Sequence, residues 1–166
     1  MKKIAASLFI LLIAGSVSGN YKKMYKKKKK KTVTQAAVVN NTNMKSALMG
    51  RSACFGKCPS YTIEVFETGI LRYTGKSFVT KEGVYEKNIG ANKAISFLKE
   101  FNTIRPDTLH YLYQTKVADL PGFYFFISYP DSVKRVINAD AGPEMLRDWA
   151  QKFDQLSPLD DSWTKK

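Results

Sequence analysis

The 166-residue chain has only two cysteines and one histidine. Two cysteines and His110 do not complete the four ligands of a structural zinc site, so we predict no metal site. A cysteine hydrolase would have His110 as its sole imidazole base, and no oxyanion motif accompanies it. No paired acids or phosphate-binding loop occur at diagnostic spacing either. The sequence therefore predicts no cofactor and points away from an enzyme.

The chain also lacks an apolar run of the roughly 18 to 20 residues that a membrane-spanning helix requires. The shorter apolar run at residues 4–14 follows Lys2 and Lys3 and precedes small residues at 15–19. This order is typical of a secretory signal peptide. We therefore expect residues 1–19 to direct export to the periplasm or the extracellular space, with no transmembrane span in the mature chain. A retained signal anchor is the alternative.

Acidic side chains are absent from the first 50 residues, which contain eleven lysines. The formal charge of the chain is +13, yet residues 51–166 carry 16 basic and 14 acidic side chains, a balance of only +2. The domain itself thus offers no basic stripe, and export would separate it from nucleic acid. Nucleic acid is therefore not an expected partner.

Eight of the lysines lie between Lys22 and Lys31. Self-repulsion and the lack of apolar neighbours predict that residues 20–31 are disordered. Such a segment could contact an anionic surface of the cell envelope, or serve only as a solvated spacer. The uncharged residues that follow predict a linker over 32–48, with a short strand at 32–39.

The patterning of residues 49–157 predicts a single domain, followed by a C-terminal tail at 158–166. Alternating apolar and polar residues at 61–65 predict a strand, and the turn at 67–69 joins it in a hairpin to residues 70–74. A second hairpin is predicted between residues 78–80 and 84–89, because Gly83 can adopt a positive φ in the connection.

Two helices and one more strand pair complete the prediction. Apolar residues spaced by three and four predict a helix over 91–104, begun by Asn92 and ended before Pro106. A second apolar stripe predicts a helix that starts at Pro143 and ends before Pro158.

The aromatic run at 123–129 predicts a central strand buried on both faces, paired with residues 132–138. The expected fold is α+β, in two layers: a mostly antiparallel sheet of four to six strands with two helices on one face.

Cys54 and Cys58 are predicted to form a disulfide, since the chain is expected to reach an oxidising compartment. A disulfide needs Cα atoms about 4.4 to 6.8 Å apart, whereas four extended residues span about 13 Å. The chain must therefore turn, and Gly56 permits a turn. Pro59 favours an extended Cys58, so the loop should lead directly into the strand that contains Tyr61.

A thiol–disulfide redox module is the alternative use of the same two cysteines. Such enzymes usually place two residues between the cysteines, at the start of a helix. Here three residues intervene and a strand is predicted to follow. A structural disulfide is therefore preferred.

Candidate binding residues lie in two parts of the sequence. Those around the cysteine loop are Arg51, Phe55, Lys57 and Tyr61. Those between the first helix and the aromatic strand are His110, Tyr111, Tyr113 and Asp119. The second set could form a groove wall with Phe123, although large aromatic residues serve cores equally well. Asp119 could also hydrogen-bond the backbone of its own turn.

The cysteine segment C-F-G-x-C-P-x-Y resembles an uncharacterised domain of exported bacterial proteins, many of them lipoproteins. The resemblance runs from about Met49 to Leu156 and includes these further positions: Arg51, Gly69, Tyr73 to Gly75, Gly83, Asp119 to Pro121 and Pro143. It implies a module boundary and an extracytoplasmic compartment, and it implies no activity. The chain departs from the lipoprotein members because it has no lipidation cysteine and carries the lysine block. We expect a non-enzymatic domain that binds a protein or an envelope component.

Overall fold

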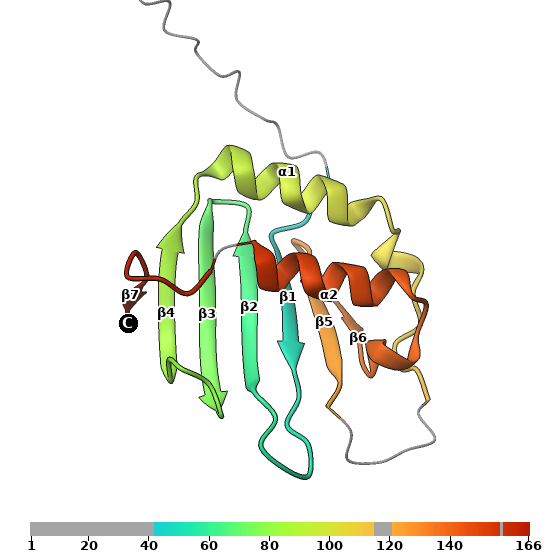
Figure 1. Ribbon diagram of the computed structural model, residues 1–166. Helices are drawn as coiled ribbons and strands as arrows, with labels where there is room; N and C mark the ends of the chain where they lie inside the picture. Colours follow the sequence, from blue (N-terminus) through green and yellow to red (C-terminus); the bar gives the residue numbers. More distant parts are fainter. Residues whose placement is uncertain (1–41, 115–120, 157) are drawn as a thin grey trace, which may run out of the picture. The chain divides into compact units, whose positions relative to one another are not determined.

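The computed structural model describes residues 42–114, 121–156 and 158–166. They form one sheet with the strand order β6-β5-β1-β2-β3-β4-β7, together with two α-helices (Figure 1). The α+β prediction is confirmed, but the sheet has seven strands, more than the four to six expected. The predicted signal peptide, the lysine segment, the strand at 32–39 and Asp119 lie outside the described residues.

One interior strand of the sheet was not predicted from the sequence. Strand β1 (Ser46–Arg51) lies between β2 (Ser60–Phe66) and β5 (Phe123–Ser128), and it pairs antiparallel with both. Its residues Ala47 and Met49 are fully buried. The short segment contains Gly50 and begins in the predicted linker, so its sequence carries only a weak strand signal.

The first predicted hairpin is confirmed, whereas the second is confirmed only in its second strand and in the positive φ of Gly83. Strand β2 turns at Gly69 into β3 (Ile70–Ser77), which then pairs antiparallel with β4 (Gly83–Asn88). Residues 78–80 were predicted as a strand but lie in the β3–β4 connection. The reason is that β3 extends past Thr74 and takes the place of that strand as the partner of β4.

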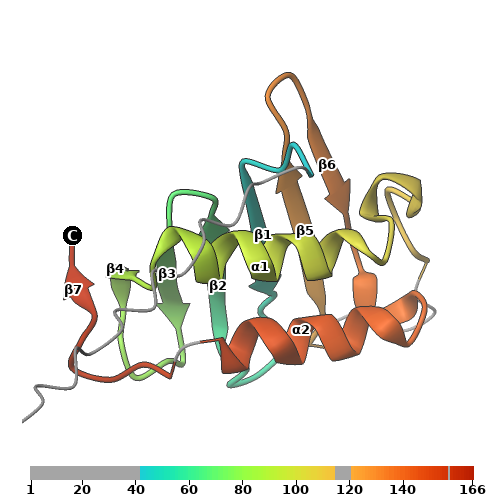
Figure 2. The same ribbon diagram turned by 90° about the horizontal axis from the view of Figure 1, so that it is seen from above.

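Both α-helices, α1 (Ala91–Asn102) and α2 (Met145–Gln155), lie against the same face of the sheet (Figure 2). Asn92 does not begin α1 as predicted. The N-cap residue is Gly90, at a φ of 84°, and its N–H donates to the side-chain oxygen of Asn88. Glycine adopts this backbone conformation without the steric cost that a side chain brings. Two short 3-10 helices, η1 (Pro106–Thr108) and η2 (Ala139–Ala141), accompany them.

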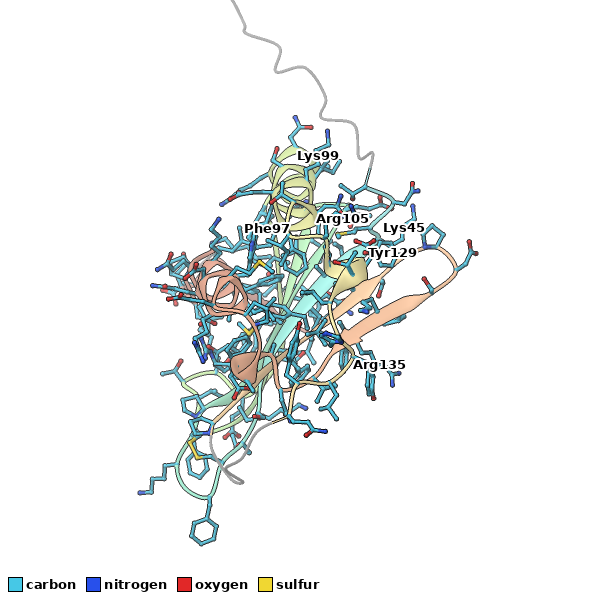
Figure 3. All side chains as sticks on the ribbon, turned by 90° about the vertical axis from the view of Figure 1, so that its right-hand side faces the viewer. Lys45, Phe97, Lys99, Arg105, Tyr129 and Arg135 are labelled. Carbon is cyan, nitrogen blue, oxygen red and sulfur yellow. A yellow bond between two sulfur atoms is a disulfide. The ribbon has the colours of Figure 1, made fainter. Side chains whose placement is uncertain are left out.

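The core fills the space between the helices and one face of the sheet. Strand β5 is buried on this face only, which corrects the prediction of two buried faces: Phe123, Phe125 and Ile127 are buried, whereas Tyr124 and Phe126 are half-buried. Phe97 of α1 points into this core beside α2, with its ring centroid 4.9 Å from that of Phe153 (Figure 3).

The opposite face of the sheet carries mixed polar and apolar side chains. Arg135, on β6 (Val133–Val136), lies on the side of the sheet away from α2 (Figure 3). Its guanidinium lies 5.5 Å from the ring centroid of Phe126.

The C-terminal residues, predicted as a tail, complete the sheet. Strand β7 (Thr164–Lys165) pairs with β4, and Trp163 is only 6% exposed. The indole N–H of Trp163 donates to the carbonyl oxygen of Pro158 at 2.9 Å. This buried tryptophan attaches the end of the chain to the domain.

Candidate recognition site at the disulfide loop

The connection between β1 and β2 is a short loop closed by a disulfide between Cys54 and Cys58, at the lower end of the sheet in Figure 1. The two Cα atoms are 5.7 Å apart, within the range that a disulfide requires. Gly56 makes the turn at a φ of 154°, and its N–H donates to the Cys54 carbonyl oxygen at 2.9 Å. Strand β2 starts directly after Pro59, as predicted.

The tip of the loop presents an aromatic side chain to solvent. Phe55 is 93% exposed, and the neighbouring Lys57 is also exposed. An exposed phenylalanine forgoes about 1.5 to 3 kcal/mol of burial free energy. The loop thus carries an apolar group that the rest of the domain does not cover.

Three side chains connect the base of this loop to α2. Arg51 and Tyr61 face each other across β1 and β2, and both reach Asp154 of α2. The Tyr61 hydroxyl donates to Asp154 Oδ1 at 2.7 Å and accepts from Arg51 Nε at 3.0 Å. Arg51 also donates to Asp154 Oδ2 through Nε at 3.1 Å and through Nη2. The cluster therefore links two strands and a helix.

Burial and the carboxylate determine the protonation of this cluster. Burial raises the pKa of Tyr61 to about 12, and the hydrogen bond to Asp154 adds to the effect. For Arg51, burial alone lowers the pKa, but its hydrogen bond and attraction to Asp154 outweigh this and raise the pKa. At neutral pH, Tyr61 is thus a protonated phenol and Arg51 is a cation that compensates the charge of Asp154. Because its pKa is raised, the Tyr61 hydroxyl stays protonated at neutral pH and is not suited to act as a general base.

Two cavities flank Tyr61, and Pro59 and Tyr61 line both. The first, of about 350 Å³, is bounded by the following residues: Pro59, Tyr61, Ile63, Tyr73, Phe78, Val79, Thr80, Asp154, Leu159 and Trp163. The second, of about 380 Å³, is bounded by these: Arg51, Ser52, Lys57, Cys58, Pro59, Tyr61, Pro121 and Gly122. Volumes of this size suit small ligands or single side chains.

The predicted site residues divide into two groups in the structure. Arg51, Phe55, Lys57 and Tyr61 lie together at the disulfide loop. His110, Tyr111 and Tyr113 line neither cavity. They follow η1 instead, where the Tyr113 N–H donates to the Ile137 carbonyl oxygen, and His110 packs edge-on against Tyr113.

Phe123, expected to share a groove with that second group, is 7% exposed and packs against Phe125 in the core. Its place in a ligand groove is therefore not supported by the packing.

Several residues of the site were not predicted from the sequence, above all Asp154, Tyr73 and Trp163. Asp154 lies 103 positions after Arg51, and in the sequence it is one acidic residue among the polar positions of an amphipathic helix. Tyr73 and Trp163 resemble core residues. No signal in a single sequence would have assigned them to the cavity. The loop residues were found because the cysteine spacing marks them.

The described residues contain no helix long and apolar enough to cross a membrane. They also contain no cluster of three or more His, Cys, Asp or Glu side chains that could hold a metal ion. The family described as "Domain of unknown function (DUF6438)" matches residues 45–157, from just before β1 to just after α2. No curated protein matches the chain, and no solved structure does.

Proposed function

Since the chain belongs to the DUF6438 family of domains of unknown function, we propose that it is a non-enzymatic binding module that uses the loop at residues 54–58 to contact a protein or another component of the cell envelope. The observation that carries the proposal is Phe55, which is 93% exposed at the tip of a loop closed by a disulfide. An uncovered aromatic side chain on a constrained loop is well suited to be a binding anchor.

The constraint matters because ordering a loop on binding costs conformational entropy. The disulfide and the hydrogen bond from Gly56 to Cys54 limit the shapes of this loop before any partner arrives. The cluster of Arg51, Tyr61 and Asp154 holds the strands at its base. Burial of the Phe55 ring can therefore contribute to affinity with little ordering cost.

The compartment is part of the same proposal. The order of basic, apolar and small residues at 1–19 supports export to the periplasm or the extracellular space. A disulfide between Cys54 and Cys58 agrees with an oxidising environment. Envelope components are consequently the first partners to test.

The test is capture from envelope fractions of the source cells by the immobilised full chain and by a Phe55→Ala variant. We expect the variant to bind its partner roughly thirty-fold more weakly, which corresponds to about 2 kcal/mol for the loss of one aromatic anchor. Its melting temperature should not change, because the Phe55 side chain is almost entirely exposed.

Val133→Ala is the matched control, since Val133 is also an exposed apolar residue, at 54%, but lies on β6. The control should capture the same component as the unsubstituted chain. Equal capture by Phe55→Ala and the unsubstituted chain would show that the loop is not the contact element.

A redox module is the second candidate, because both cysteines of the pair are partly accessible to solvent. The reduction potential of the pair separates the two functions. A structural disulfide is expected to have a potential below about −300 mV, whereas thiol oxidoreductases lie between about −270 and −120 mV. We expect a potential below about −300 mV. A helix N-terminus would stabilise a thiolate, but this loop leads into strand β2 instead. A potential in the oxidoreductase range would favour catalysis over binding.

A further inference from the structure

The first cavity is lined by a tyrosine whose hydroxyl is not used by the fold and remains available to a ligand. Tyr73 is only 2% exposed as a residue and lines this cavity. Its hydroxyl makes no hydrogen bond to any residue that the structure describes, and no side-chain N or O atom of those residues is both buried and unpaired, so the hydroxyl itself is accessible. Burial raises the pKa of Tyr73, so the hydroxyl stays protonated at neutral pH. It can therefore donate a hydrogen bond to an oxygen acceptor of a ligand in the cavity.

The walls of the cavity are mainly apolar and aromatic. Tyr73 stands between Tyr61 and Trp163, at centroid distances of 5.6 Å and 6.3 Å. The remaining apolar lining comes from these residues: Pro59, Ile63, Phe78, Val79 and Leu159. The indole N–H of Trp163 already donates to Pro158, so it is not available to a ligand. Such walls suit an apolar group better than a sugar ring, which needs many polar contacts.

The charge of the cavity is compensated within the protein. Asp154 is its one ionisable carboxylate, and both of its oxygens already accept hydrogen bonds from Arg51 or Tyr61. The salt bridge to Arg51 balances its charge. A cationic ligand would have to compete with this pair, and an anionic ligand would meet the carboxylate. Charge complementarity therefore favours an uncharged ligand.

We propose that this cavity binds an uncharged, apolar side chain from an extended peptide segment of the partner, with a peptide carbonyl of that segment accepting a hydrogen bond from the Tyr73 hydroxyl. This inference rests on the proposed function, and it names a second contact beside the Phe55 loop. Pro59 belongs both to the segment that follows the loop and to the cavity wall. One extended segment could therefore touch the loop and fill the cavity.

The experiment titrates the full chain with N-acetyl-L-phenylalaninamide and monitors the indole resonance of Trp163 by NMR. N-acetylglycinamide, which lacks the side chain, and N-acetylglucosamine, which shares the acetamide group, are the comparison probes. We expect a saturable shift with the phenylalanine amide and none with the other two. The absence of saturable binding by the phenylalanine amide would overturn the proposal, and equal or tighter binding of the sugar would assign the cavity to carbohydrate instead.

Tyr73→Phe removes the hydroxyl and keeps the ring, so we expect the affinity for the phenylalanine amide to fall roughly fivefold to tenfold. The control is Tyr124→Phe, since Tyr124 lies outside this cavity on the exposed face of the sheet. Val79→Trp, in the β3–β4 loop, is expected to block the cavity and abolish binding. Unchanged affinity in Tyr73→Phe would contradict the hydrogen bond, and unchanged affinity in Val79→Trp would contradict the location.

These results are separable from the Phe55 capture experiment. If capture depends on Phe55 but the amide does not bind, the cavity assignment fails alone. If the amide binds to a chain whose capture does not depend on Phe55, the proposed role of the loop fails and the cavity assignment stands.

Discussion

At the residue scale, Asp154 shows how one side chain can join separate parts of a fold. It accepts hydrogen bonds from Arg51 at the end of β1 and from Tyr61 near the start of β2. Each partner contributes a donor, and the two donors use both carboxylate oxygens. The ion pair is partly shielded, with side-chain exposures of 35% for Arg51 and 26% for Asp154. Partly shielded pairs are screened less by solvent than exposed pairs.

We predict that Asp154→Asn lowers the free energy of unfolding by about 1 to 2 kcal/mol, because it leaves a partly buried Arg51 without its counter-charge. This range is set below the cost of a fully buried pair because solvent still reaches both side chains. Urea denaturation of the purified full chain measures the effect.

Glu100→Gln provides the comparison, because Glu100 of α1 pairs with Lys152 of α2 at 57% and 45% exposure. Exposed pairs contribute at most about 1 kcal/mol, so this variant should be nearly as stable as the unsubstituted chain. If the two variants lose the same stability, the cluster under the loop contributes no more than an ordinary surface ion pair.

The residue scale also shows what the sequence could and could not predict of the site. Arg51, Phe55, Lys57 and Tyr61 were recognised because they surround a distinctive cysteine spacing. Asp154 was not, since it lies in another element and has no distinctive neighbours in the sequence. His110 and its neighbouring tyrosines attracted attention by residue type, yet they line neither cavity.

At the element scale, the β3–β4 hairpin builds one wall of the proposed ligand cavity. The loop between β3 and β4 packs so closely on β3 that a Cβ atom added at Gly75 would overlap the Lys81 carbonyl oxygen. The same loop supplies Phe78, Val79 and Thr80 to the cavity. The small size of one glycine thus permits the close approach that shapes this wall.

We predict that Gly75→Ala lowers the free energy of unfolding by about 1 to 3 kcal/mol, because the added methyl group meets backbone that must shift. The variant should also weaken binding of the phenylalanine amide, since the loop that it displaces lines the cavity. Urea denaturation and the NMR titration measure the two effects.

Gly50→Ala is the matched control on β1. A Cβ atom there would meet the far end of the half-buried Tyr124 side chain, which can rotate away. We expect it to cost less than about 1 kcal/mol and to leave amide binding unchanged. Equal losses in the two variants would mean that the β3–β4 loop does not depend on the small size of Gly75.

Elements with a local pattern were predicted well, and elements that depend on distant partners were not. The β2–β3 turn and the apolar stripes of α1 and α2 are visible in the sequence because each involves neighbouring residues. The extent of β3 was not visible, because its pairing with β4 decides where the strand ends. The burial of β5 on one face likewise depends on which face the helices cover.

At the scale of the whole molecule, the two ends of the domain occupy different positions in the sheet, one in its interior and one at its edge. Among the described residues, the first strand, β1, lies in the interior of the sheet, and the last, β7, forms its edge beside β4. The disulfide loop adds a local constraint, since closing so short a loop contributes only about 2 kcal/mol by chain entropy. The broad core, rather than the disulfide, therefore holds the domain together.

The sequence by itself determined the α+β class, the two helices, the first hairpin and the turn that brings Cys54 and Cys58 together. These features depend on residues that are close along the chain, where periodicity and backbone preference act directly. Only the tertiary structure decided that Ser46–Arg51 is an interior strand, that Trp163 is buried against the core and that Asp154 pairs with Arg51. Those contacts join distant residues, and their free energy arises only when the whole sheet and both helices pack together.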